Sequence, residues 1–243
     1  MIEPNFIIAC FSAFLIGMSK SGIKGIGVLF VTFIAIVYGA KNSTGIIMPL
    51  LVFGDIFAVI YYKRHTKWIY ILKFLPWMIF GVLVAVFIGK NIPEFIFKIL
   101  MSIIIISSVI LMWVWDSINP KKIPTNWFFS IIMGKLAGIT TMIGNLAGPF
   151  ANLYFLALRI PKNEFIGTSA WLFFLINIFK VPFHIFSWKT INTESIDISL
   201  TLMPTDLIGL LVGVKIVRKI NNESYRKLIL FFTAVSALGI LIM

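Results

Sequence analysis

Four lysines lie inside stretches that are otherwise apolar, where lipid rather than water would surround the chain. A lysine at the centre of a bilayer costs roughly 3 kcal/mol even on a lenient insertion scale, so an ionisable residue at that depth indicates a function. Only Asp55 and Asp206 fall at comparable positions and could neutralise such charges. We therefore predict an interior with excess positive charge, suited to an anion. The four lysines are Lys20, Lys24, Lys135 and Lys180.

Two runs of small and polar residues, 17–27 and 138–149, interrupt the apolar segments. They align with each other, with Gly22 opposite Gly144 and Gly27 opposite Pro149. Non-helical backbone at membrane depth is tolerated only where protein or a water-filled cavity covers it. Two such breaks at corresponding positions of a repeat indicate a transporter's binding site.

A helix is predicted to begin within each break, at about Gly22 and at about Gly144. Its unpaired N–H groups and its dipole make a helix N-terminus a site for anions. Hydroxyl and amide side chains around the breaks would add hydrogen bonds to an oxyanion. We predict a substrate site formed by Ser19, Lys20, Ser21, Gly22, Lys24, Gly25, Thr140, Thr141, Gly144, Asn145, Asn177 and Lys180.

Three further residues are candidates for ion coupling or gating: Asp55, Pro182 and His184. Asp55, which aligns with Asn177 in the second half, is either a proton-coupling carboxylate or the structural partner of a lysine. Pro182 should kink its helix and free a carbonyl near Lys180. His184 could relay protons near neutral pH. A histidine near the end of a span is more often an interfacial anchor, and we favour that interpretation.

The lysines also have simpler interpretations. Lys20 and Lys24 could be snorkelling lysines at a helix end, although a place in or near the transport pathway is favoured. Lys135 lies near the start of its segment and is the weaker candidate. For Lys180 a functional and a structural role are equally well supported.

The composition is that of an integral membrane protein. Of 243 residues, 60% are hydrophobic and 12% charged, against the roughly 25% charged of a soluble domain. The net charge of +12 is interpreted as membrane topology and not as nucleic-acid binding. No cleavable signal peptide is predicted at the N-terminus. The single cysteine, Cys10, permits no internal disulfide and no cysteine-based metal site.

No motif of an enzyme or of an ATP-driven pump occurs. The sequence has no His-Glu-x-x-His, no P-loop and no Gly-x-Ser-x-Gly. We therefore expect no catalysis, no cofactor and no bound metal.

The apolar segments recur in two halves at an offset of about 122 to 128 residues, which indicates an internal duplication. Each half begins with a pair of short segments, which fits either two tilted spans or a re-entrant hairpin. Residues 39–43 are expected to form a turn. The first repeat is predicted to comprise a hairpin at 5–40 and helices at 44–63, 68–89 and 94–115. After a cytoplasmic linker at 117–125, the second comprises a hairpin at 126–159 and helices at 165–188, 196–217 and 223–243.

Whether the short pair forms two spans or a re-entrant hairpin, each half crosses the membrane an odd number of times, so the repeats must be inverted. The predicted fold class is an all-α polytopic membrane protein with two inverted repeats. Lysine and arginine mark the cytoplasmic side, which places both termini outside the bacterial cytoplasmic (inner) membrane. The cytoplasmic side collects Lys63, Arg64, Lys67, Lys73, Lys121, Lys122, Arg159, Lys162, Lys215, Arg218, Lys219, Arg226 and Lys227, and the other side Lys41, Lys90, Lys98 and Lys189.

Several motifs together resemble the sulfite exporter TauE/SafE family, also called TSUP, over essentially the whole chain. They are Gly22-x-x-Gly-x-Gly27, Pro49 with Gly54-Asp55, Tyr62-Lys-Arg-His65 before Trp68, Leu75-Pro76 with Gly81, the run 134–149, Gly167-Thr-Ser-Ala170, the run 177–184, and Pro204 with Gly209. The resemblance implies a transporter of sulfur-containing anions such as sulfite, sulfonates and sulfoacetate. It also implies two inverted repeats, with substrate near their interface around Gly22 and Gly144.

The resulting hypothesis is a secondary transporter of a small oxyanion that works by alternating access, with the anion and the lipid bilayer as its partners. Two alternatives stay open: a membrane scaffold or assembly subunit with a basic face that recruits a partner or anionic lipid, and an anion channel. A homodimer is expected only by analogy with the fold.

Overall fold

The computed structural model describes residues 4–117, 126–221, 224 and 225, and every regular element among them is helical. In lipid, a helix satisfies all backbone hydrogen bonds within one segment, which is why long apolar runs take this form. The helices are α1 Pro4–Lys20, α2 Gly27–Tyr38, α3 Ala40–Tyr62, α4 Trp68–Gly89, α5 Glu94–Ser117, α6 Trp127–Gly144, α7 Gly148–Ala157, α8 Lys162–Pro182 and α9 Thr193–Lys219.

Five of the described helical segments are long and apolar enough to cross a membrane: Ala40–His65, Trp68–Gly89, Trp127–Gly144, Lys162–Ser187 and Thr193–Lys219. The helices α1 and α2 are shorter apolar helices. The chain is therefore a multi-pass, all-helical membrane protein. The helix α6, the first arm of the hairpin predicted at 126–159, has 18 residues and is therefore one of these spans.

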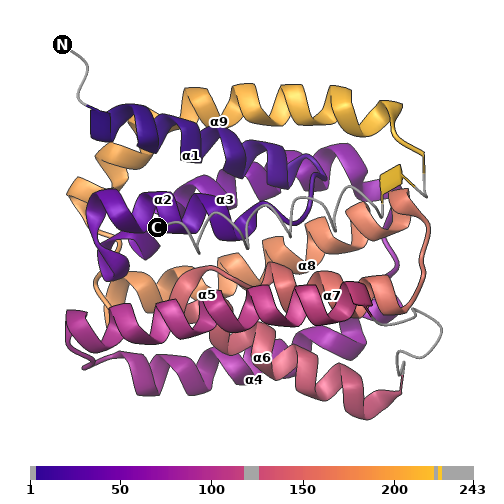
Figure 1. Cartoon of the computed structure of the whole chain (residues 1–243), viewed down its shortest axis with the longest axis horizontal. Coiled ribbons are helices and arrows are strands. Elements are labelled where there is room, and N and C mark those ends of the chain that lie inside the picture. Colours follow the sequence, from indigo (N-terminus) through magenta and orange to yellow (C-terminus); the bar gives the residue numbers. More distant parts are fainter. Residues whose placement is uncertain (1–3, 118–125, 222–223, 226–243) are drawn as a thin grey trace.

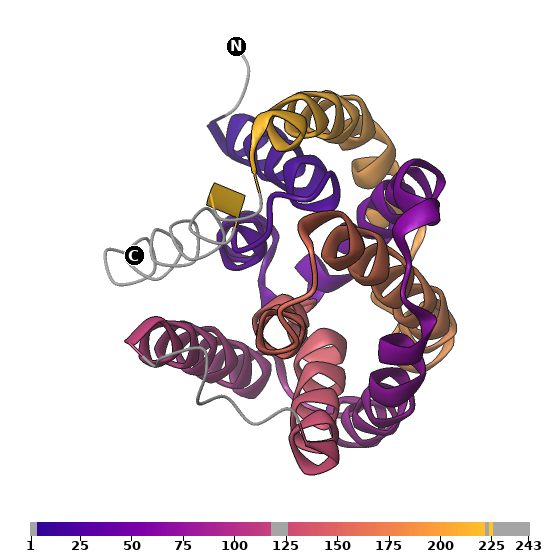
Figure 2. The ribbon, with the colours of Figure 1, turned by 90° about the vertical axis from the view of Figure 1, so that its right-hand side faces the viewer.

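The helices run roughly along the long axis of the molecule (Figure 1) and are seen nearly end-on in Figure 2. The helix α1 packs along α9, and α4 packs along α6. These two pairs form opposite edges of the view in Figure 1, and α3 contacts α8 between them.

Two helical hairpins enter this bundle from opposite ends. The hairpin of α1 and α2 enters from the left of Figure 1, where the N-terminus lies, and the hairpin of α6 and α7 enters from the right. Their non-helical tips, residues 21–26 and 145–147, are buried. The two breaks identified in the sequence thus approach each other within the protein.

The second arm of each hairpin begins later than predicted, at Gly27 rather than Gly22 and at Gly148 rather than Gly144. Gly22 has a φ of 117° and Asn145 a φ of 55°. Both values lie in the left-handed region, which a right-handed helix cannot accommodate. The breaks are therefore true loops of several residues.

The expected turn at residues 39–43 is also wrong. Gly39 alone separates α2 from α3, with a φ of 84°, and α3 begins at Ala40. The predicted last helix at 223–243 and most of the linker at 117–125 lie outside the described residues, together with Lys121, Lys122, Arg226 and Lys227.

Candidate functional site

A small, partly open cavity of about 50 Å³ lies between the two hairpin tips, which is room for a few water molecules. Residues from both halves of the chain line it. They are Ser19, Lys20, Lys24, Gly25, Gly27, Val28, Phe30 and Leu51 from the first half, and Thr141, Asn145, Leu146, Ala147, Gly148, Pro149, Asn152, Phe173 and Asn177 from the second.

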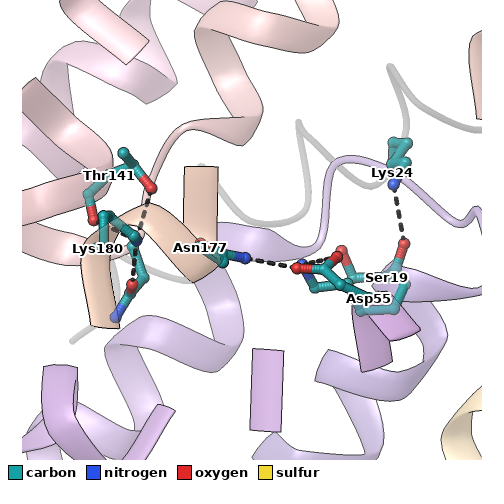
Figure 3. Close-up of polar contacts among 8 residues, drawn as sticks. Ser19, Lys24, Asp55, Thr141, Asn177 and Lys180 are labelled. Atoms are coloured by element: carbon teal, nitrogen blue, oxygen red, sulfur yellow. Dashed lines mark hydrogen bonds and ion pairs between the residues drawn. The ribbon is translucent and has the colours of Figure 1, made fainter. Parts of the chain in front are cut away.

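A buried ion pair anchors the first tip. Lys20, the last residue of α1, places Nζ 2.6 Å from Oδ1 of Asp55 on α3. The other carboxylate oxygen, Oδ2, accepts a hydrogen bond of 2.6 Å from the Asn177 amide on α8 (Figure 3). Asp55 is fully buried. Both of its oxygens are therefore engaged, and the residue joins the tip to a helix of each half.

A second cluster anchors the other tip. The Lys180 ammonium on α8 donates to the carbonyl and the hydroxyl of Thr141 and to Oδ1 of Asn145, each at 2.9 Å (Figure 3). Lysine has three N–H donors. All three are used, and the positive charge lies at the C-terminal end of α6, where the helix dipole favours it.

Lys24 lies on the cavity and has no carboxylate partner among the described residues. Its ammonium donates to the Ser19 carbonyl at 3.3 Å (Figure 3) and lies 5.3 Å from the centre of the Phe173 ring. Only 4% of Lys24 is exposed, and 6% of Lys20, so neither is a snorkelling lysine. A buried ammonium without a counter-charge favours an anion beside it.

Two helix N-termini also face this cavity. Its lining includes Gly27 and Val28 at the start of α2, and Gly148 and Pro149 at the start of α7. Neither helix has a side-chain cap on its first turn. The free N–H groups and the dipoles of both helices therefore favour negative charge in the cavity.

The predicted substrate residues divide into two groups. Seven line the cavity: Ser19, Lys20, Lys24, Gly25, Thr141, Asn145 and Asn177. The other five do not line it: Ser21, Gly22, Thr140, Gly144 and Lys180.

Local hydrogen bonds explain where these five residues lie. The Ser21 hydroxyl donates to the Met18 carbonyl, and that of Thr140 to the carbonyls of Leu136 and Leu146. Hydroxyl groups in helices bond readily to preceding carbonyls, which takes them away from a ligand. The other three shape the tips: Gly22 lies in the loop, Gly144 ends α6, and Lys180 holds that helix end from outside the cavity.

One residue outside the cavity, His184, also differs from expectation. His184 was favoured as an interfacial anchor, yet it is fully buried, and its Nδ1 lies 2.8 Å from the Thr190 hydroxyl. It belongs to a π-helical segment, Phe183–Ser187, that begins directly after Pro182. Proline removes a donor from the helical ladder, which accounts for the change of helix type at this point.

Lys135 lies away from the cavity. Its ammonium lies 5.5 Å from the ring centre of Trp77 and 5.0 Å from that of Phe80, both on α4. These cation–π contacts explain a lysine in an apolar helix without a role in the site.

The sequence interpretation missed Phe173, whose ring lies beneath both Lys20 and Lys24. One signal for it existed. Phe173 precedes Asn177 by one helical turn and therefore lies on the same face of α8.

Comparison with models of known protein families identifies the family of the chain. The family model of the sulfite exporter TauE/SafE matches residues 9–240, nearly the whole chain. The chain belongs to the sulfite exporter TauE/SafE family. The resemblance seen in the motifs is thereby confirmed, and because TauE/SafE is a transporter family, membership implies a transporter and not an enzyme. No curated protein and no solved structure matches the chain significantly.

Proposed function

We propose that the protein is a secondary transporter that exports a small sulfur oxyanion, such as sulfite, a sulfonate or sulfoacetate, across the bacterial cytoplasmic membrane. The anion binds in the cavity between the two hairpin tips, beside Lys24 and the N-termini of α2 and α7. One observation carries the proposal: a buried ammonium without a carboxylate partner among the described residues faces the same cavity as two uncapped helix N-termini. Every one of these groups favours negative charge.

Reciprocal packing supports an inverted repeat around this site. A methyl group at Gly17 would collide with the Asp206 carbonyl, and one at Gly138 with the Met78 carbonyl. The sequence shift of about 122 to 128 residues relates the two contacts. It relates two further pairs of contacts in the same way. Methyl groups at Gly209 and Gly81 would collide with the carbonyls of Phe14 and Lys135, respectively. Methyl groups at Gly45 and Gly167 would collide with the carbonyls of Thr190 and Tyr62.

The positions of basic residues support the proposed orientation. Lys67 pairs with Glu164 at 3.2 Å, and Lys162 donates to the carbonyls of Val217 and Ile220. These contacts join the α3–α4 connection, the start of α8 and the end of α9 at one end of the bundle. Positive residues mark the cytoplasmic end. On this orientation both chain termini lie outside.

The direction of transport follows from the membrane potential. The cell interior is negative, and one elementary charge moving through 100 mV is worth about 2.3 kcal/mol. Anions are therefore driven outward without a coupling ion. Alternating access would occur by movement of each hairpin tip against the helices that hold it.

The binding step is tested with purified protein and a panel of anions: sulfite, thiosulfate, sulfate, sulfoacetate, taurine and small carboxylates. We expect saturable thermal stabilisation by at least one sulfur oxyanion, because a ligand that binds the folded state alone raises its stability. The variant Lys24→Gln should lose this stabilisation while its ligand-free melting temperature stays close to that of the wild type.

The matched control is Lys135→Gln, which removes a lysine whose ammonium lies over the Trp77 and Phe80 rings and does not line the cavity. It should retain the anion response. The proposal is wrong if no anion stabilises the wild type, or if Lys24→Gln responds as the wild type does. Stabilisation by anionic lipid alone would favour the scaffold alternative, and flux that does not saturate would favour a channel.

A further inference from the structure

Asp206 on α9 is a buried carboxyl group that the transport site does not use. The residue is fully buried, and neither carboxylate oxygen has a hydrogen-bond partner among the described residues. In this it differs from Asp55, whose two oxygens are bound by Lys20 and Asn177. An ionised carboxylate without partners in an apolar interior is very costly, so a group in this position neutralises itself by binding a proton.

Asp206 nevertheless lies close to the charges of the site. Its backbone packs against Gly17, one helical turn before Lys20 on α1. The charged groups that act on the carboxyl are Lys20 on α1 and Asp55 on α3, the two helices that pack against α9 in this region. The thiol of Cys10 on α1 interacts with the side chain of Thr205, the residue before Asp206.

A proton is the simplest ligand that the surroundings of Asp206 allow. Cations such as Ca²⁺ require several oxygen ligands. No group of three or more histidine, cysteine, aspartate or glutamate residues is assembled anywhere in the described residues. A single unpartnered carboxyl can bind a proton without any other ligand.

We propose that Asp206 is the proton-binding residue that couples proton movement to anion transport. The inference rests on the proposed function. In the conformation described here Asp206 is protonated, and Lys20 pairs with Asp55. When the O–H bond breaks and the proton passes to water, the new carboxylate competes for Lys20, which then leaves Asp55.

Proton and anion are co-transported under this scheme. Protonation of Asp206 adds one positive charge to the interior, which favours the anion electrostatically. With a doubly charged anion, the loaded site carries one proton and two negative charges. The membrane potential therefore still favours export.

The test uses the full-length protein in proteoliposomes with radiolabelled thiosulfate and sulfoacetate, which do not titrate near neutral pH. The readout is the steady-state accumulation ratio under an imposed pH gradient at zero membrane potential. One co-transported proton predicts an accumulation about tenfold greater for each pH unit. The variant Asp206→Asn, which cannot release a proton, should show no dependence on the gradient. Asp197→Asn, on an exposed position of the same helix, should behave as the wild type.

Infrared spectroscopy gives a second readout that needs no transport. The wild type should show the carbonyl stretch of a protonated carboxylic acid, and Asp206→Asn should lack it. Accumulation by Asp206→Asn that still follows the pH gradient, or an unchanged infrared band, would overturn the inference. If the wild type exchanges neither anion, these two are not its substrates, and the infrared band alone then decides whether Asp206 holds a proton.

Discussion

Lys24 and Lys180 are both buried ammonium groups, yet their hydrogen bonds assign them different roles. Lys180 donates all three of its hydrogen bonds to Thr141 and Asn145, so it fixes the second tip. Lys24 has one hydrogen bond in the described structure, to the Ser19 carbonyl, and lies on the cavity. At this scale the proposed anion site is the place where a buried ammonium has no carboxylate partner among the described residues.

Replacing Lys180 with methionine should therefore affect stability first. The change removes three hydrogen bonds and leaves the buried Oδ1 of Asn145 without its lysine donor, at a cost of about 1–3 kcal/mol, although the Thr141 carbonyl keeps its bond from the Asn145 N–H. Lys24→Met should cost less, because its one acceptor, the Ser19 carbonyl, keeps a hydrogen bond from the Gly22 N–H, and it should still abolish anion binding. Thermal unfolding with and without thiosulfate separates the two effects. Equal melting temperatures for the two variants would contradict these roles.

The sequence could identify the lysines but not their roles. A lysine in an apolar run is visible from composition alone, as are Asn145 and Asn177 beside the breaks. The direction of each side chain depends on where α6 ends, and the left-handed conformation of Asn145 decides that. The environment of Asp206 was equally hidden, because its isolation depends on which side chains α1 and α3 present to it.

The two hairpins are the elements that build the site, and glycine lets the long helices approach them closely. Gly17→Ala and Gly138→Ala should each destabilise the protein by about 1–3 kcal/mol, because the added methyl group meets backbone atoms that cannot move aside. Gly148→Ala is the control, since its nearest neighbour would be the Asn152 amide nitrogen at 3.8 Å. Thermal unfolding of the three variants checks the prediction, and a loss as large for Gly148→Ala would contradict it.

Two tyrosines hold the first hairpin tip. The Tyr62 hydroxyl donates to the Ser21 carbonyl at 2.7 Å, and that of Tyr225 to the Gly22 carbonyl at 2.6 Å. If alternating access requires this tip to move, the two bonds oppose the movement.

Removing both hydroxyls should loosen the tip selectively. The double variant Tyr62→Phe, Tyr225→Phe loses both hydroxyl hydrogen bonds, and each is worth about 1 kcal/mol of stability. Hydrogen exchange of the amides at 21–26 should accelerate by an order of magnitude or more, while exchange at 145–147 stays as in the wild type. Equal acceleration at both tips would mean that the tyrosines stabilise the protein globally.

At the scale of the whole molecule, apolar length and composition were enough to predict an all-helical, multi-pass protein, because lipid leaves the backbone few alternatives. The starts of α2, α3 and α7 were not predictable to the residue. They depend on positive φ angles at Gly39 and Asn145 and on a loop between Lys20 and Gly27 that no periodicity marks.

The proposed orientation makes a whole-molecule prediction. In a Cys10→Ser background, a cysteine at Lys90 should react with a membrane-impermeant maleimide added to intact cells, and one at Lys63 should react only after lysis. Both positions are exposed, at opposite ends of the helices α3 and α4. The reverse labelling would place the termini inside and invalidate the assigned direction of export.

The bond between Tyr225 and Gly22 also has a consequence for biosynthesis. It joins residues 203 positions apart in a chain of 243. A nascent chain therefore inserts its first hairpin long before the ribosome has made the hydroxyl that secures it. A product truncated before Tyr225 contains every residue that lines the cavity but lacks one of the two hydroxyls that hold the first tip.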